Sequence, residues 1–137
     1  MISNKCKYAI KALTHIARHN DGSKAVMTAD IAREQGIPRK FLEIILRDLR
    51  NNRILESKRG KDGGFRLLRP AEDISLTKIM RIIDGPIAML PCVSLNYYRS
   101  CDDCDEDQCE VKGAFEQVRD KTLEVLNGKT IKSLILK

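Results

Sequence analysis

The feature that most constrains the fold is a pair of short helical patterns joined by a very tight turn. Residues 29–35 and 39–52 both place apolar side chains at helical spacing. Thr28 is the expected N-cap of the first of these helices, and Gly36 is expected to end it. Pro38 suits the start of the second helix. Two helices connected this closely, through a glycine-containing turn, are typical of a helix-turn-helix.

The hydrophobic period changes directly after this pair. Residues 54–57 and 64–68 have the character of two short strands, and residues 58–63, KRGKDG, have the composition of a turn. The three positive charges lie at the expected tip of this hairpin. We therefore expect a mostly α fold with a small β-hairpin wing, that is, a winged helix-turn-helix.

The remaining chain supplies more helices and one aperiodic stretch. Residues 1–19 are helical in pattern, and Ser75 is expected to cap a further helix that stops at residues 84–86, DGP. A last long helix is expected over residues 111–126, with an apolar stripe suited to pairing with a second copy. With 137 residues, the chain is too short for two independent cores. The expected divisions are a DNA-binding domain over 1–84, a cysteine-rich sensor loop over 85–110, and a dimerisation helix with a C-terminal tail over 111–137.

The charge distribution indicates a polyanion partner for the first half of the chain. Residues 33–69 hold eleven basic side chains against five acidic ones, whereas residues 92–110 hold one basic and six acidic side chains. A basic helix can enter the major groove of DNA while cations on a wing meet phosphates or the minor groove. A basic surface exposed only to solvent is the alternative, and charge alone does not separate the two. The ordered series of turn, basic helix and basic hairpin favours DNA.

Four cysteines, Cys92, Cys101, Cys104 and Cys109, lie within 18 residues in the spacing C-x8-C-x2-C-x4-C. Thiols this close are metal ligands, a redox switch, or a coincidence. Short loops bring the sulfurs together at a small entropic cost, which favours ligands. Spacing alone does not distinguish an iron–sulfur cluster from an all-thiolate zinc site.

The run TADIAREQGI at residues 28–37, together with residues 41–50 and the glycines of the hairpin, resembles the IscR/NsrR family of bacterial repressors, the Rrf-two family. The resemblance covers nearly the whole chain. It implies a winged-helix homodimer on a near-palindromic operator, and several such regulators sense iron–sulfur status, nitric oxide or redox stress. It also implies that Glu43 reads a base and that Arg59 enters the minor groove. The candidate DNA-contacting residues are Thr28, Pro38, Arg39, Lys40, Glu43, Arg47, Arg50, Lys58, Arg59, Gly60 and Lys61.

The resemblance also bears on the cysteines, because cluster-binding relatives place three cysteines in this loop. Those relatives add a fourth ligand that is not a cysteine, either a histidine where this chain has Lys112 or an acidic residue where it has Tyr8. The expected ligands here are therefore Cys92, Cys101, Cys104 and Cys109, which would hold a 2Fe–2S cluster. A 4Fe–4S cluster, structural zinc and a cluster-free thiol switch are the alternatives.

Other reactive side chains carry weaker signals. Cys6 is expected to pack as a small apolar residue, with a ligand role across a dimer as the alternative. His15 and His19 are four residues apart and could chelate a metal, but the segment between them lacks the glutamate of a zinc-protease helix. Acidic neighbours disfavour a reactive thiolate at Cys101 or Cys104, so no enzyme is expected. No apolar run is long enough to span a membrane, and a cytoplasmic protein without a small-molecule substrate is expected.

Overall fold

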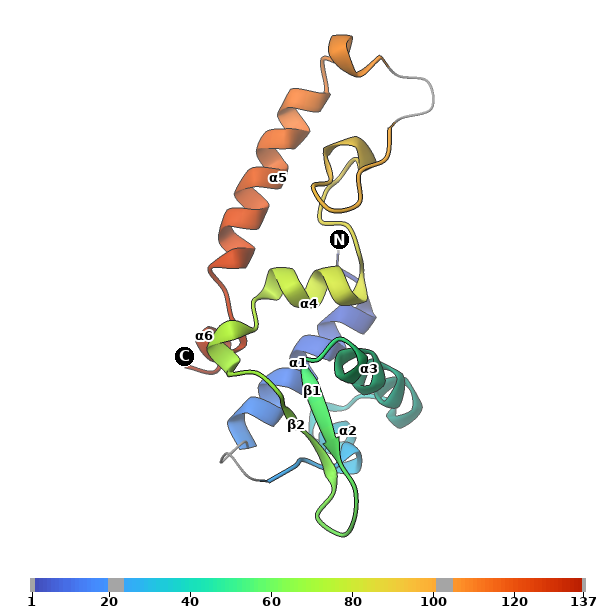
Figure 1. The fold of residues 1–137 in the computed structure, drawn as a ribbon, viewed down its shortest axis with the longest axis vertical. Coiled ribbons are helices and arrows are strands. Elements are labelled where there is room, and N and C mark those ends of the chain that lie inside the picture. Colours follow the sequence, from blue (N-terminus) through green and yellow to red (C-terminus); the bar gives the residue numbers. More distant parts are fainter. Residues whose placement is uncertain (1, 20–23, 101–104, 137) are drawn as a thin grey trace.

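The structure is a computed structural model that describes residues 2–19, 24–100 and 105–136. Its larger helices are α1 (Asn4–His19), α2 (Thr28–Gln35), α3 (Arg39–Asn51), α4 (Leu76–Ile83), α5 (Lys112–Asn127) and α6 (Ile131–Ile135). The strands β1 (Leu55–Lys58) and β2 (Gly64–Leu67) form one antiparallel hairpin, and η1 (Ala71–Asp73), η2 (Pro91–Val93) and η3 (Glu106–Gln108) are short 3-10 helices. Helices predominate and the hairpin follows α3, so the predicted winged-helix class is confirmed (Figure 1).

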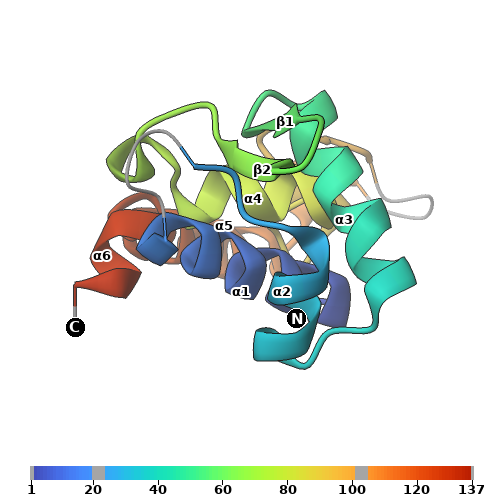
Figure 2. The same cartoon turned by 90° about the horizontal axis from the view of Figure 1, so that it is seen from below.

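The core forms around α1, which contacts α2, α3, α4, α6 and β2. Figure 2 shows α1 crossing the middle of this assembly with α6 beside it. One face of α3, made of Leu42, Ile45, Leu46 and Leu49, is fully buried, as its sequence period predicted. Truncating a buried leucine of this kind to alanine typically costs about 2–5 kcal/mol of unfolding free energy. The core therefore holds α3 with its opposite face toward solvent.

The start of α2 differs from the sequence-based expectation. The N-cap is Met27, and Thr28 is the first helical residue, without a capping hydrogen bond from its side chain. The Met27 carbonyl oxygen accepts hydrogen bonds from the amides of Asp30 and Ile31, at 3.1 and 3.2 Å. Val26 is paired with Phe65 of β2, which holds the chain extended up to Met27 and lets the helix begin one residue early. Gly36 ends α2 in the left-handed conformation, as predicted.

The wing is anchored to the connection between α1 and α2. The amides and carbonyls of Val26 and Phe65 exchange two hydrogen bonds of 2.8 Å, so Val26 extends the hairpin by one residue of a third strand. Gly64 has a φ of +145°, and a Cβ atom there would collide with the Val26 carbonyl group. Only glycine fits this close approach without displacing the backbone.

The segment after α5, expected as a tail, forms α6 and belongs to the core. Thr130 and Ser133 make a reciprocal capping box at its start, and Ile131 is fully buried. The Ile131 amide donates to the Ile74 carbonyl at 2.9 Å, and the Leu76 amide donates to the Lys129 carbonyl at 2.9 Å. The C-terminal end of α5 therefore joins the winged-helix core, whereas its N-terminal end extends away from that core (Figure 1). Among the described residues, no helix is long and apolar enough to cross a membrane.

Candidate nucleic-acid interface and cysteine segment

The outward face of α3 carries the predicted DNA-contacting side chains. Arg39, Lys40, Glu43, Arg47 and Arg50 are all exposed, on the side of the helix opposite its buried leucines. The Glu43 carboxylate lies 3.5 Å from the Arg39 guanidinium, one helical turn away. This pairing orients an acceptor that is suited to a cytosine amino group.

Sequence reasoning did not single out Ile44, which shares this face. Its side chain is 46% exposed, although an isoleucine between Glu43 and Ile45 looks like a core residue in the sequence. The helical period was the available signal, because Ile44 falls outside the buried face of α3. An exposed isoleucine on a basic helix is suited to contact with a thymine methyl group.

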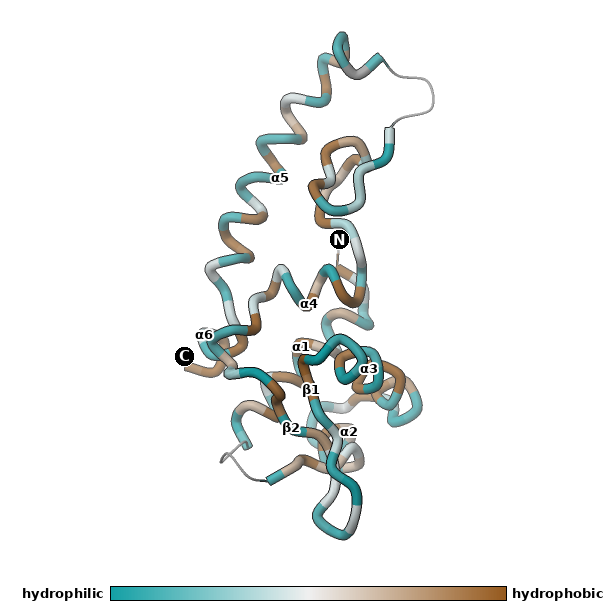
Figure 3. Tube along the Cα trace, viewed as in Figure 1, coloured by the Kyte–Doolittle hydropathy of each residue, from teal (hydrophilic) through white to brown (hydrophobic). Residues whose placement is uncertain are grey.

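The wing tip, residues 58–63, is the second part of this surface. Lys58, Arg59 and Lys61 are exposed, and Gly60 turns the chain with a φ of +107°. The hairpin points away from α5, and its tip is among the hydrophilic parts of the chain (Figure 3). Below the tip, Glu56 and Arg66 are directly opposed across the strands and form an ion pair. The wing therefore presents its cations on a hairpin braced by both this pair and Val26.

Thr28 and Pro38 complete the set of predicted contacts. Thr28 is half-buried at the start of α2, and Pro38 is exposed directly before α3. Neither caps its helix with a side chain. Both lie on the helix-turn-helix, so a role in contacting DNA remains a prediction for each.

The cysteine segment, residues 85–110, connects α4 to α5. Cys92 is buried within η2, and Cys109 is half-buried shortly before α5, while Cys101 and Cys104 lie outside the described residues. The segment is attached on both sides: the Tyr97 hydroxyl donates to the Arg81 carbonyl of α4 at 3.4 Å, and Arg119 of α5 donates to the Val93 carbonyl at 2.9 Å. Sequence reasoning missed both contacts, because neither residue belongs to a motif.

The two described cysteines stand at different levels along α5. Cys109 precedes the helix, whereas Val93, next to Cys92, is bonded to Arg119 in its second turn.

Cys6 lies in the core, as its place on an apolar helix predicted. It is fully buried, and burial together with the nearby Asp84 carboxylate raises the pKa of its thiol to about 11. Asp84 is itself held by the Ser3 amide, which donates to one of its oxygens at 3.0 Å. A protonated, enclosed thiol is a packing group and not an available ligand.

Comparison with known proteins assigns this architecture. The sequence model of the Rrf2 family, described as an iron-dependent transcriptional regulator, matches residues 2–137. The chain belongs to the Rrf2 family. An rrf2-like HTH-type transcriptional regulator of Rhodobacter capsulatus is 41% identical, with 98% of this chain and 92% of the relative covered. The IscR regulator of Pectobacterium atrosepticum is 28% identical, over 98% of this chain and 78% of its own length.

Solved structures agree with this assignment. CymR of B. subtilis, titled the global cysteine regulator, superposes with a TM-score of 0.79 at 25% identity and covers 98% of this Rrf2 chain and 95% of its own. T. potens IscR superposes with a TM-score of 0.77 at 26% identity, covering 98% and 85%. The resemblance seen in the sequence is thus confirmed. The chain is a transcriptional regulator with a DNA-binding helix-turn-helix, and the expectation that it is not an enzyme is confirmed by the same relatives.

Proposed function

We propose that this Rrf2-family chain is a homodimeric repressor whose affinity for a near-palindromic operator is controlled by an iron–sulfur cluster in the cysteine segment. The observation that carries the proposal is the position of that segment. It is attached to α4 through Tyr97 and to α5 through Arg119, so a change in its conformation would act on both helices. These contacts support a coupling between the cysteine segment and the DNA-reading half.

The DNA half rests on the exposed face of α3 and on the wing tip. Glu43 and Ile44 offer an acceptor and an apolar contact for base edges, and the surrounding arginines and lysines neutralise phosphates. Arg59 at the wing tip would reach the minor groove. Two copies related by a twofold axis would read two half-sites, which predicts a near-palindromic operator.

The dimer half rests on α5. Val111 at the N-cap of α5, and Val118 and Val125 within the helix, repeat every seven residues and are 51%, 43% and 59% exposed. Such a stripe is suited to pairing with the same helix of a second copy. Pairing through α5 would place the two winged-helix units at opposite sides of the contact, with their spacing set by the angle at which the helices cross.

The sensing half rests on the donor chemistry of the segment. Cys101, Cys104 and Cys109 are close in sequence, and Cys92 is the fourth thiol that the segment offers. Four thiolates fit a 2Fe–2S or a 4Fe–4S cluster, which when bound supplies a centre sensitive to iron, oxidants and nitric oxide. Binding of a cluster to these thiolates would change the conformation of the segment and so alter the contacts of Tyr97 and Arg119.

A thiol switch without a cluster is the second candidate. The observation that favours it is the likeness to CymR of Staphylococcus aureus in a structure titled as its oxidized form, with a TM-score of 0.76 and 28% identity. In that case a disulfide within the cysteine segment would replace the cluster as the element that orders it. Binding of a structural zinc ion by the same thiolates is the remaining alternative.

The deciding experiment is a measurement of iron, acid-labile sulfide and zinc per chain on protein purified without oxygen. Near-stoichiometric iron and sulfide, lost on Cys104→Ala but retained on Cys6→Ala, are expected. Operator affinity should then differ at least tenfold between protein with and without the cluster, at matched salt, a coupling of about 1.4 kcal/mol. Zinc in place of iron, or equal affinity in both forms, would contradict cluster control.

A further inference from the structure

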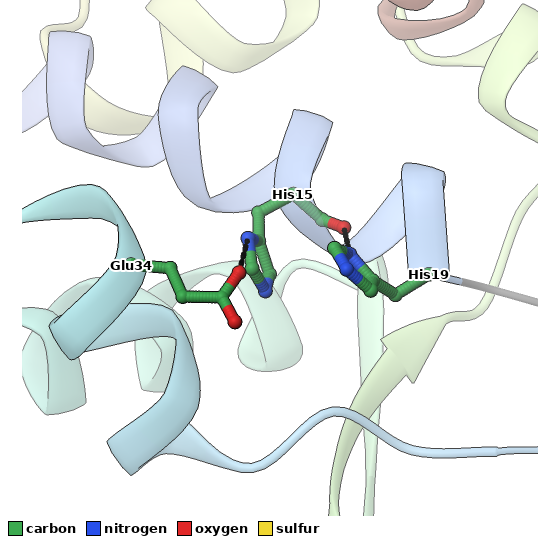
Figure 4. A group of neighbouring side chains, drawn as sticks. All are labelled: His15, His19 and Glu34. Carbon is green, nitrogen blue, oxygen red and sulfur yellow. Dashed lines mark hydrogen bonds and ion pairs between the residues drawn. The ribbon is translucent and has the colours of Figure 1, made fainter.

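Three side chains at the junction of α1 and α2 lie close enough to share an ion. His15 and His19 project from successive turns of α1, and Glu34 faces them from α2 (Figure 4). Each offers one ligand atom, and the three atoms lie within 4.8 Å of one another. The imidazole rings are stacked with their centroids 4.3 Å apart, and the Glu34 carboxylate is 3.6 Å from Nδ1 of His15.

The hydrogen bonds indicate which nitrogen of each imidazole carries the lone pair. Nδ1 of His19 lies 2.9 Å from the His15 carbonyl oxygen, which can only accept, so Nδ1 carries the proton and Nε2 of the neutral ring has the lone pair. Nδ1 of His15 faces both Glu34 and the Gln35 amide, which donates to it at 3.2 Å, so the lone pair of this ring is on Nδ1 and an ion bound there would replace the Gln35 hydrogen bond. An imidazole whose second nitrogen is held by a backbone carbonyl is the usual arrangement of a metal-binding histidine.

We propose that His15, His19 and Glu34 form a metal site, separate from the cysteine segment, that takes a divalent transition-metal ion such as Zn²⁺ or Co²⁺. Two imidazoles and one carboxylate are a ligand set that such ions accept, with water in the remaining positions. Metal–ligand bonds of about 2.0–2.1 Å require the ligand atoms to lie roughly 3.3 Å from one another. His19 and Glu34 would move to reach this separation. His19 is exposed and the Glu34 side chain is 48% exposed, whereas His15 is buried and stays in place.

The surroundings of the site carry charges of both signs. His19 and Asp30 line a cavity of about 720 Å³ between the α1–α2 connection and the wing, and Lys24, Lys58 and Lys61 line the same cavity. The Asp30 carboxylate near the histidines is paired with the Arg33 guanidinium at 2.9 Å. Arg18 is the neighbouring cation on α1, and it is exposed. An ion bound here would tie α1 to the first helix of the helix-turn-helix.

Hydrogen bonding alone is the competing explanation for this cluster. Gln35 satisfies His15, so His15 would be explained as a buried polar residue without any ion. That explanation leaves Nε2 of the exposed His19 to solvent and gives no role to the carboxylate and the second imidazole beside His15. The two explanations differ in one measurable respect, which is the affinity of the chain for the ion.

The test is a titration of the full chain, freed of metal with a chelator, with Co²⁺ followed by absorption spectroscopy. Thiolate ligands give intense near-ultraviolet charge-transfer bands, whereas nitrogen and oxygen ligands give only weak visible bands, so the two sites are read separately. We expect one Co²⁺ per chain that gives the weak bands, in addition to any Co²⁺ that the thiolates of the cysteine segment bind. Its affinity should fall at least tenfold in His19→Ala and in Glu34→Gln, and Zn²⁺ should displace it.

Glu124→Gln, an exposed glutamate on α5, is the matched control and should leave Co²⁺ affinity unchanged. The two test variants alter exposed side chains, and their folded state is checked by circular dichroism. Binding that shows thiolate bands only, or equal Co²⁺ affinity in the parent chain, His19→Ala and Glu34→Gln, would overturn the site. Neither result depends on iron or sulfide in the cysteine segment. The Co²⁺ titration therefore tests the histidine site independently of the cluster proposal.

Discussion

Nη1 of Arg119 donates a hydrogen bond to the Val93 carbonyl oxygen, 2.9 Å away, and this contact joins the cysteine segment to α5. The Arg119 side chain is only 15% exposed, and its other guanidinium nitrogens are held by Asp120 at 2.9 Å. Charge-assisted hydrogen bonds from a half-enclosed guanidinium are stronger than neutral ones. The contact with Arg119 therefore holds η2 in place against α5.

Arg119→Met should loosen this attachment while keeping much of the side-chain volume. The loss of a charge-assisted hydrogen bond predicts a fall of about 1–3 kcal/mol in the free energy of unfolding, measured by urea denaturation. Proteolysis within residues 85–110 should become faster. Lys121→Met, which alters an 83% exposed side chain two residues along the helix, is the control and should change neither quantity. Unchanged proteolysis in Arg119→Met would show that other contacts hold the segment.

Arg59→Ala and Lys61→Ala should weaken DNA binding in different ways. Arg59 in the minor groove would contribute to sequence discrimination, so its loss should cost about 1–3 kcal/mol on the operator and less on random DNA. Lys61 meeting phosphate alone would affect operator and random DNA equally and reduce the salt dependence of binding. Fluorescence anisotropy with both DNAs at several salt concentrations measures these effects. An identical operator affinity in both variants and the parent chain would remove the wing tip from the interface.

Gly64→Ala and Gly113→Ala should have opposite effects on stability. At Gly64 the backbone is in a conformation that side chains rarely adopt, and a Cβ would meet the Val26 carbonyl, so a loss of more than about 1 kcal/mol is expected. Gly113 lies in the first turn of α5 with open space around it, so alanine should stabilise the helix by up to about 1 kcal/mol. Thermal unfolding followed by circular dichroism compares the two. Equal tolerance at both positions would mean that Val26 does not hold the wing.

The Cys6 thiol predicts a loss of stability in alkaline solution. Its pKa is about 11 in the folded chain against an ordinary value of 9.0, so the unfolded chain releases the proton first. The folded state therefore loses stability between about pH 9 and pH 11, whereas below pH 9 the thiol is protonated in both states. Urea denaturation of the parent chain and Cys6→Ala should show a difference that shrinks across this range.

Alkylation provides an independent check on Cys6. At pH 8 the native thiol should react far more slowly with iodoacetamide than the same thiol in the unfolded chain, because it is enclosed and protonated. Mass spectrometry of the peptide that contains Cys6 follows the reaction. A native rate equal to the unfolded rate would instead indicate that α1 opens easily at its N-terminal end.

The periodic parts of the fold could be predicted from the sequence. The buried face of α3, the glycine that ends α2 and the Ser75 cap of α4 each follow from a few neighbouring residues, and all three agree with the structure. Thr28 as an N-cap was wrong because a distant strand pair, Val26 with Phe65, holds the chain extended as far as Met27. Local propensity does not include such a pairing.

The C-terminal segment and the contacts of the candidate sites could not be predicted in the same way. The α6 helix has only five residues, too few for a stable helix on its own, and it forms because Ile131 is buried and its amide is bonded to Ile74. Glu34 meets His15 only because α2 packs on α1, although the two histidines were visible at a helical spacing.

The sequence by itself determined the helices, the hairpin, the family and the identity of the chemical groups, because these depend on local period, turn residues and residue type. Only the tertiary structure decided which groups meet: Val26 with the wing, Arg119 with the cysteine segment, and Glu34 with two histidines. The reason is physical. A hydrogen bond or a metal site depends on distances of a few ångströms, and these are set by the packing of segments that lie far apart along the chain.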